Sequence, residues 1–522
     1  MRCRSPSEGS SKPAKVRRAA ATVLTLVGAT AAAIFSGQVG RGAEKPPRPN
    51  FIFILADDLG YGDLGCYGQT KIRTPNIDRI AAEGLRFTQH YAGSAVCAPS
   101  RCVLMTGKHP GHAWVRDNRS HPPEGQEPLP ADEITLLKLL QSAGYVTGGF
   151  GKWGLGGPGT SGDPLKQGID RWFGYNCQSL AHNFYPTYLW DNDRKIALDN
   201  PAFPAHDAFR TGEDPSDPKS YRRFQGKQYS ADLIAEEARR FIRENKDRPF
   251  FCYVPTTVPH LALQVPDDSL QEYLGRWDDP PYTGGKGYLP HFSPRAAYAA
   301  MITRMDREVG RIMDLVRELG LDEKTVFVFS SDNGPLNGVH QGFAGTDARF
   351  FNSSGGLRDG KGTLYEGGVR VPGIVRWKGV IQPGAVSHRV TGFEDWLPTI
   401  LELAGRKEAI PAGIDGISFA PTLFGEQQPE RPFLYREFPG YGGQQSIRVG
   451  PWKLLRRNLQ PTKKDAAQGR KPSLELYDLA SDPREERDVA AAHPDVVARL
   501  MHLMNQQHVP SKQFPFPALD RP

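Results

Sequence analysis

The chain has 522 residues, of which 65 are lysine or arginine and 58 are aspartate or glutamate, and its formal net charge is +7. This length favours one large domain accompanied by a smaller one. Residues 1–43 hold seven basic residues and one acidic residue and contribute +6, so the remainder carries +1. The overall charge therefore gives no support for a nucleic-acid-binding protein.

The first 43 residues have the features of an export signal. A basic start precedes an apolar stretch over residues 19–35, and small residues follow at Gly42 and Ala43. We expect cleavage near Ala43, and hence an exported protein, periplasmic or secreted, without stable membrane insertion. The apolar stretch is only marginally long enough to span a membrane, so an uncleaved anchor is the second interpretation.

From residue 50 to about residue 404, short apolar runs alternate with helical patterns. This alternation predicts an α/β fold with a large, mostly parallel central sheet flanked by helices. The expected strands are 51–55, 145–150, 249–254 and 325–329, and the expected helices are 76–83, 134–143, 231–245 and 295–319. The runs 51–55 and 325–329 are uninterrupted apolar sequences, as expected of strands buried on both faces.

After about residue 430 the pattern changes to short strands at 446–449, 453–455 and 474–477 and a closing helix at 494–507. We expect a smaller C-terminal α+β domain with a short antiparallel sheet. The tail from Val509 holds several prolines and is expected to be extended or disordered. The predicted organisation is a signal peptide at 1–43, an α/β domain at 44–429 and a C-terminal domain at 430–522.

Acidic residues follow the two most apolar strands directly. Asp57 and Asp58 come after 51–55, and Asp332 and Asn333 come after 325–329. Because the carboxyl ends of parallel strands meet at one edge of a sheet, these side chains should converge there. Three carboxylates and an amide, with no histidine among them, favour a hard cation such as Ca²⁺ or Mg²⁺. Either pair alone would more often be an ordinary turn.

Cationic residues occur where an anionic substrate would need them. Arg101 lies one helical turn after Cys97, and Lys152 and His260 each follow an expected strand. Lys361 lies in a glycine-rich segment, 355–368, that allows close approach of the backbone. His260 could protonate a leaving alcohol, although a histidine packed in a turn is the ordinary alternative.

Cysteine usage singles out one position. Removal of residues 1–43 leaves five cysteines, and the odd one is expected to be a free or modified residue. Cys97 is the candidate, because Pro99 suits a first helical turn and would place Cys97 at the positive end of a helix dipole. Four cysteines are expected to be structural: Cys66, Cys102, Cys177 and Cys252.

These segments together resemble the formylglycine-dependent type I sulfatases of the alkaline phosphatase-like superfamily. The resemblance is carried by the pattern C-x-P-S-R at residues 97–101, by the segment 57–63 around Asp57 and Asp58, and by the surroundings of Lys152 and Lys361. It runs from about Pro49 to the segment 476–483 and therefore covers nearly all of the chain after the export signal.

The resemblance implies hydrolysis of sulfate esters by a Cα-formylglycine, formed from Cys97 by a formylglycine-generating enzyme. One hydroxyl of the hydrated aldehyde would attack sulfur and the other would later expel sulfate. The resemblance implies one Ca²⁺ held by Asp57, Asp58, Asp332, Asn333 and the modified Cys97. It also implies that Arg101 steadies the formylglycine and that three residues hold the sulfate: Lys152, His260 and Lys361.

One position departs from the family pattern. Many members have a histidine two residues after the first lysine, where this chain has Gly154. His182, in the long loop that follows, is the candidate for filling the same space and contacting the sulfate or the diol. Asp332 is the alternative proton acceptor.

Two alternative functions remain open from the sequence. A phosphatase or phosphodiesterase of the same superfamily would need a second metal site, which we cannot assemble from these residues. A non-catalytic binder of sulfated glycans would result if Cys97 stays a thiol. Export and loop aromatics such as Trp172, Tyr175 and Trp190 favour a sulfated carbohydrate as the substrate.

Overall fold

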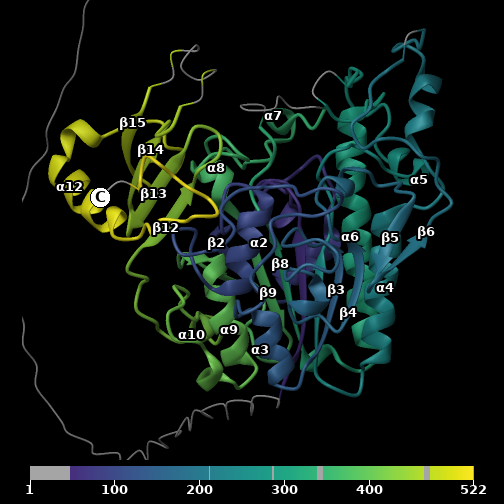
Figure 1. Cartoon of the computed structure of the whole chain (residues 1–522). Coiled ribbons are helices and arrows are strands. Elements are labelled where there is room, and N and C mark those ends of the chain that lie inside the picture. Colours follow the sequence, from purple (N-terminus) through teal and green to yellow (C-terminus); the bar gives the residue numbers. More distant parts are fainter. Residues whose placement is uncertain are drawn as a thin grey trace, which may run out of the picture. The chain divides into compact units, whose positions relative to one another are not determined.

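Parallel strands make up the centre of the larger of two sheets in the computed structural model (Figure 1). The structure describes residues 48–520 except 211, 285–286, 338–344, 462, 464–468 and 470, so the predicted export signal lies outside the described residues. The strand order is β10-β2-β9-β8-β1-β7-β3-β4-β5-β6, with β11 paired to β2. The bounds are β1 Asn50–Ala56, β2 Leu85–Tyr91, β3 Val146–Lys152, β4 Arg171–Tyr175, β5 Tyr188–Asp191, β6 Arg194–Ala197, β7 Phe250–Pro255, β8 Thr325–Ser331, β9 Arg370–Trp377, β10 Ala385–Ser387 and β11 Thr391–Gly392.

The five neighbouring strands β8, β1, β7, β3 and β4 are all parallel, which confirms the mostly parallel sheet. Antiparallel pairs enter through β9, which lies between β8 and β2, and through the hairpin of β5 and β6. The four strands expected in this region end within two residues of β1, β3, β7 and β8.

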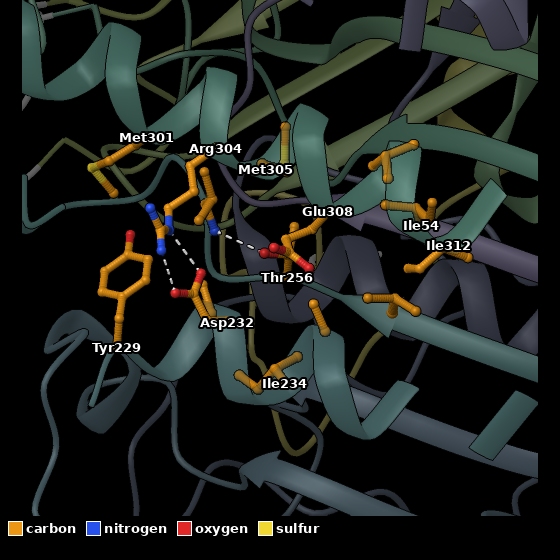
Figure 2. A pocket seen from close by; sticks show the side chains of 15 residues that line it. Ile54, Tyr229, Asp232, Ile234, Thr256, Met301, Arg304, Met305, Glu308 and Ile312 are labelled. Carbon is orange, nitrogen blue, oxygen red and sulfur yellow. Dashed lines mark hydrogen bonds and ion pairs between the residues drawn. The ribbon is translucent and has the colours of Figure 1, made fainter. Parts of the chain in front are cut away.

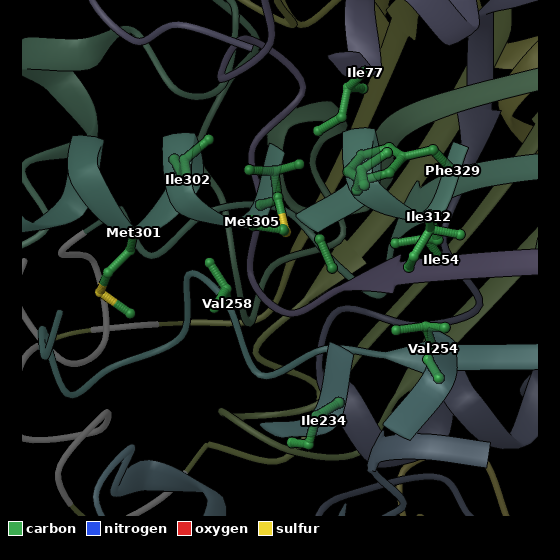
Figure 3. Packing of buried hydrophobic residues seen from close by; sticks show 14 of the residues in the cluster. Ile54, Ile77, Ile234, Val254, Val258, Met301, Ile302, Met305, Ile312 and Phe329 are labelled. Carbon is green, nitrogen blue, oxygen red and sulfur yellow. The ribbon is translucent and has the colours of Figure 1, made fainter. Parts of the chain in front are cut away.

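Helices cover both faces of this sheet, as expected. One face packs against α1 (Pro75–Ala82), α4 (Ser230–Glu244) and α6 (Pro294–Glu318), and the other against α2 (Cys97–Thr106), α3 (Leu136–Ser142) and α9 (Trp396–Leu403). Alternate residues of β1 point to opposite faces, so Ile54 enters the first core and Phe53 the second. Figure 3 shows Ile54 beside Val254 and Ile312 in the first core.

A cleft opens between α4 and α6 on that first face (Figure 2). Apolar side chains such as Ile234 and Met305 line most of it, and Arg304 forms an ion pair with Asp232 at 2.6 Å. None of the described residues that line it is a predicted site residue. We therefore interpret this cleft as a feature of helix packing rather than as the site of chemistry.

The C-terminal region forms a second, four-stranded antiparallel sheet, as expected. Its strands are β12 Leu434–Phe438, β13 Gln444–Val449, β14 Trp452–Arg457 and β15 Ser473–Asp478, and they occur in chain order. Helix α12 (Pro494–Asn505) packs on it through Leu500 and Met504. Residues 45–522 form one compact unit, and the domain boundary between 429 and 430 remains a prediction.

Buried ion pairs join the small sheet to the large domain. Arg436 on β12 donates to Glu394 at 2.9 Å, and both side chains are 1% exposed. Lys453 on β14 lies 2.9 Å from Glu366 and 2.8 Å from Glu485. Because a buried charge is tolerated only when it is paired, these contacts tie the small sheet to the large domain.

The tail after Val509 is ordered where the structure describes it. Phe514 joins the core of the large domain, where Arg119 lies 4.4 Å from its ring centre, and Phe516 is fully buried. Of the two alternatives, an extended or a disordered tail, disorder was wrong, because Phe514 and Phe516 bury apolar surface. Among the described residues, no helix combines the length and apolar character needed to cross a membrane.

Candidate active site

The predicted acidic and cationic residues converge at the carboxyl edge of the parallel strands. Each of them is at most 8% exposed. They lie where the strands end: Asp57 and Asp58 after β1, Lys152 at the end of β3, His260 after β7, and Asp332 and Asn333 after β8. The parallel arrangement brings these ends together, as the strand pattern predicted.

Each carboxylate of the cluster has a cationic side chain within 2.8 Å. Lys152 Nζ lies 2.6 Å from Asp57, Lys361 Nζ lies 2.7 Å from Asp58, and Arg101 Nη2 lies 2.8 Å from Asp332. Arg101 also lies 3.5 Å from Asp57 and donates to the carbonyl of Lys152. The cluster therefore holds three carboxylates and three cationic side chains.

Burial and neighbouring charges shift the acid–base properties of these groups. Burial opposes ionisation of Asp57, but the combined positive charges around it, Lys152 foremost, hold the pKa of Asp57 well below its usual value. Burial and then the charge of Asp57 raise the pKa of Asp332. Burial alone would lower the pKa of Lys361, but the combined attraction of its neighbours, Asp58 foremost, raises it. The cluster thus holds strongly paired charges out of water.

Cys97 begins helix α2 inside this cluster. Its Sγ lies 3.4 Å from Asp57 Oδ1 and 3.7 Å from Lys361 Nζ, and the residue is 2% exposed. Burial, with the neighbouring carboxylates, raises the pKa of the Cys97 thiol. An unmodified thiol here stays protonated and is a poor nucleophile.

All five described cysteines are unpaired. The odd number of cysteines therefore does not identify Cys97, since the other four described cysteines form no disulfides either. Cys97 is distinguished by its contacts instead.

Asn333 has a buried acceptor that could bind a cation. Its Nδ2 donates to Asp58 Oδ1 at 2.8 Å and to the carbonyl of Gly334 at 2.9 Å, while its Oδ1 is buried without a hydrogen-bond partner. Such an acceptor is rarely left unpaired. Because it lies beside carboxylate oxygens, the residues present fit a hard cation such as Ca²⁺.

Two histidine rings stack beside the acidic cluster. His260 Nδ1 donates to the carbonyl of Leu261, which leaves Nε2 to accept from Lys361 at 3.2 Å. Burial and then Lys361 lower the pKa of His260 to about 4, so it is neutral near pH 7. His182 stacks on His260 with ring centres 4.5 Å apart, and its Nδ1 lies 2.9 Å from His206 Nε2.

The space next to Gly154 is filled by Gln178. A Cβ added to Gly154 would lie 2.7 Å from Gln178 Nε2. His182 instead occupies the far side of His260, so the structure brings it to the site without placing it in that space. Sequence analysis missed Gln178, although a glycine in place of a side chain already indicated that another residue must fill the gap.

Two tyrosines at the site were also missed. The centre of the Tyr288 ring lies 5.5 Å from that of His182. Tyr441 lies in the loop between β12 and β13; burial raises its pKa and the charge of Lys361 acts to lower it. In contrast, Trp172 and Tyr175, expected as platforms for a sugar, are buried on β4 and pack in the cores. Loop aromatics could not be sorted into these two classes without the packing.

A second histidine–carboxylate cluster contains His109, His112 and Asp415. His112 Nδ1 lies 2.9 Å from Asp415, and the backbone N–H of Gly111 donates to His109 Nδ1 at 3.2 Å. That donation places the proton of neutral His109 on Nε2, which faces Asp415 at 3.6 Å. A protonated nitrogen cannot bind a metal, so we interpret this cluster as a structural anchor of the loop after α2.

The fold and the site together define an enzyme of the alkaline phosphatase-like superfamily. The chain belongs to the sulfatase family, whose model, Sulfatase, matches residues 49–406. A model for the C-terminal region of N-sulphoglucosamine sulphohydrolase matches residues 356–509. The protein is therefore a sulfuric ester hydrolase.

Known proteins resemble the chain over most of its length. Human arylsulfatase A is 33% identical over 503 residues, which cover 91% of this chain and 90% of the relative. The N-acetylgalactosamine-6-O-sulfatase of Bacteroides thetaiotaomicron is 30% identical, over 88% of this chain and 93% of the relative. A solved structure concerned with glycosaminoglycan metabolism by B. thetaiotaomicron has a TM-score of 0.69 and 28% identity, over 88% of this chain and 99% of that one.

Proposed function

We propose that the protein hydrolyses sulfate esters of carbohydrates with Cys97 converted to Cα-formylglycine and with one bound Ca²⁺. The observation that carries this proposal is the place of Cys97: it lies 3.4 Å from Asp57 and 3.7 Å from Lys361, in a cluster where a thiol stays protonated. A hydrated aldehyde at that position would supply the nucleophilic hydroxyl that the thiol cannot.

The Ca²⁺ would be held by the residues whose oxygens converge: Asp57, Asp58, Asp332, Asn333 and the modified Cys97. When bound, such an ion neutralises charge on the sulfate oxygens as the S–O bond breaks. Because it would take over the carboxylates, Lys152 and Lys361 would be freed from Asp57 and Asp58 to bind the sulfate group. Arg101 would stay with Asp332 and hold the helix that carries Cys97.

The leaving group would be protonated from the histidine side of the site. His260 is held by its Nδ1–H donation to Leu261, so only Nε2 faces the cluster. That nitrogen accepts a hydrogen bond from the Lys361 ammonium at 3.2 Å, so Lys361 would either donate its own proton to the leaving oxygen or bind the sulfate directly. His182 supports the His260 ring by stacking and is the second candidate for contact with the sulfate.

A sulfated carbohydrate is the proposed substrate. One relative is named an N-acetylgalactosamine-6-O-sulfatase, and a similar solved structure concerns glycosaminoglycan metabolism. Tyr441 is 40% exposed and carries a ring on which a sugar can stack, whereas Tyr288 is buried beside His182. The predicted export of the chain agrees with a substrate outside the cytoplasm, although its signal lies outside the described residues.

The burial of Cys97 limits when it can be modified. Cys97 is 2% exposed in the folded protein. A formylglycine-generating enzyme must therefore act before helix α2 closes onto the sheet.

Three measurements on purified active protein test the proposal. Peptide mass spectrometry should show an aldehyde at position 97, metal analysis should find one calcium per chain, and kcat/KM should favour 4-nitrophenyl sulfate over the phosphate. A panel of sulfated oligosaccharides then identifies the natural substrate. Cys97→Ala should abolish turnover, whereas Cys102→Ala, a buried cysteine of the same helix, should retain it.

Other outcomes would support the alternatives. Two zinc ions per chain together with a phosphate preference would indicate a phosphatase. An unmodified Cys97 in protein that binds sulfated glycans without turnover would indicate a binding protein.

A further inference from the structure

Gly154 lies two residues after Lys152, the residue that ends β3 and donates to Asp57. Trp153, between them, donates its indole N–H to the carbonyl of Gly162. Gly154 has a φ of +88°, and its space is occupied by Gln178, with the added Cβ 2.7 Å from Nε2 and 3.1 Å from Cδ.

Gln178 reaches this space from the neighbouring strand. It follows β4, which is parallel to β3 with Tyr175 opposite Lys152, so both strand ends lie at the same edge of the sheet. Its backbone carbonyl accepts a hydrogen bond from the backbone N–H of Ala181 at 3.1 Å, in the turn that carries His182. Gln178 thus lies in the chain between β4, whose last residue is opposite Lys152, and the turn that carries His182.

The amide nitrogen of Gln178 has no partner in the protein. The residue is 5% exposed, and Nε2 is buried without a hydrogen bond. Leaving a buried donor unpaired is unfavourable, and such groups in folded proteins usually meet a ligand or water. An unpaired donor that lies against Gly154, two residues along the chain from Lys152, is suited to meet an anion.

We propose that Gln178 is a sulfate-binding residue whose Nε2–H donates to an oxygen of the bound sulfate group, in the space left by Gly154. This rests on the proposed sulfatase function and assigns a residue to its substrate site. The amide is neutral and exchanges no proton, so it binds and orients the sulfate while proton transfer stays with other groups. Glycine at 154 is needed because any larger residue would displace the amide.

The test compares two substitutions of Gln178 with one control in the calcium-loaded, modified enzyme. Gln178→Leu removes the donor, and Gln178→Glu keeps the shape but replaces the amide nitrogen by an acceptor oxygen. Both are expected to lower kcat/KM on the best sulfate ester roughly tenfold to hundredfold, as expected for a hydrogen bond to a charged group. Both should raise the inhibition constant of inorganic sulfate by a similar factor.

Gln167→Leu is the matched control. Gln167 is fully buried, and its amide nitrogen donates to the carbonyls of Pro130 and Ser161. Its replacement should lower the melting temperature while leaving the inhibition constant of sulfate unchanged. Gln178→Leu should raise the inhibition constant of sulfate while leaving the melting temperature unchanged, because the Gln178 amide nitrogen donates no hydrogen bond within the protein.

Unchanged kcat/KM and sulfate inhibition in both Gln178 variants would overturn this assignment. A lower melting temperature with unchanged sulfate inhibition would also overturn it, since Gln178 would then be structural. If the wild-type enzyme itself hydrolyses no sulfate ester, the proposed function fails instead, so the two failures are distinguishable.

Discussion

Asp332→Asn tests the proposed calcium site most directly. Asp332 Oδ2 accepts two hydrogen bonds from Arg101, at 3.0 and 2.8 Å, and Oδ1 accepts the backbone N–H of Asp58 at 3.2 Å. An asparagine has only one acceptor oxygen. Whichever way its amide turns, an N–H of the asparagine faces either Arg101 or the N–H of Asp58.

The metal-free protein should tolerate this change better than the calcium-bound form. An unpaired buried N–H costs about 1–3 kcal/mol, and two charge-assisted hydrogen bonds weaken by about 1 kcal/mol each. However, burial and the charge of Asp57 raise the pKa of Asp332, which means that its negative charge destabilises the folded protein. Removal of that charge therefore offsets part of the lost hydrogen-bond energy. With Ca²⁺ bound, there is no such offset, because the ion stabilises the carboxylate that has been lost.

The assay is urea unfolding of both proteins, with excess Ca²⁺ and with excess chelator. For the wild type at about 1,000 times the dissociation constant, Ca²⁺ should add about 4 kcal/mol to the free energy of unfolding. A loss of affinity of about a hundredfold should remove about 2.7 kcal/mol of that gain in Asp332→Asn.

Asp306→Asn is the control, since Asp306 is buried and accepts the backbone N–H groups of Asn76 and Ile77 away from the site. It should lower stability equally with and without Ca²⁺. If Ca²⁺ raises the free energy of unfolding of Asp332→Asn as much as that of the wild type, Asp332 is not a ligand and the proposed calcium site is wrong.

Three further predictions concern other parts of the molecule. His182→Ala should lower kcat roughly a hundredfold or more and His260→Ala at least as much, because His260 touches the cluster and His182 supports it; wild-type turnover in His182→Ala would remove it from the site. Burial and Glu366 raise the pKa of Glu485, so its contribution to stability is present at low pH and lost as pH rises through the folded-state pKa. Glu485→Gln should therefore reduce the decline in melting temperature between about pH 5 and about pH 8, and an unchanged decline would contradict this. Phe514→Ala should lower the free energy of unfolding by about 3–5 kcal/mol, whereas Val509→Ala, at a position that is 48% exposed, should change it little; equal effects in urea unfolding would mean that the tail is not anchored.

The strand ends could be predicted from sequence because each is marked locally. An apolar run such as 51–55 followed by Asp57 and Asp58 identifies a buried strand and the direction in which its polar end points. Parallel pairing then brings distant ends together without further information. For this reason the acidic cluster was predictable, as were the positions of Lys152 and His260 beside it.

Loop side chains could not be predicted in this way. Gln178 lies at the site because a turn after β4 points it into a space left by Gly154, and neither residue marks the other in the sequence. The order of the tail depends likewise on which cores accept Phe514 and Phe516. Both depend on three-dimensional packing between distant segments, which has no local periodicity.

The buried ion pairs between the small sheet and the large domain bear on how such enzymes can be recombined. Glu394 and Glu366 belong to the large domain, whereas their partners Arg436 and Lys453 belong to the small sheet. A chimaera that takes its last hundred residues from a relative would leave a buried charge without a partner wherever the two sequences do not match at such a pair. Because Tyr441 comes with that same segment, a designer who wishes to graft a new substrate preference must transplant the matching acids as well.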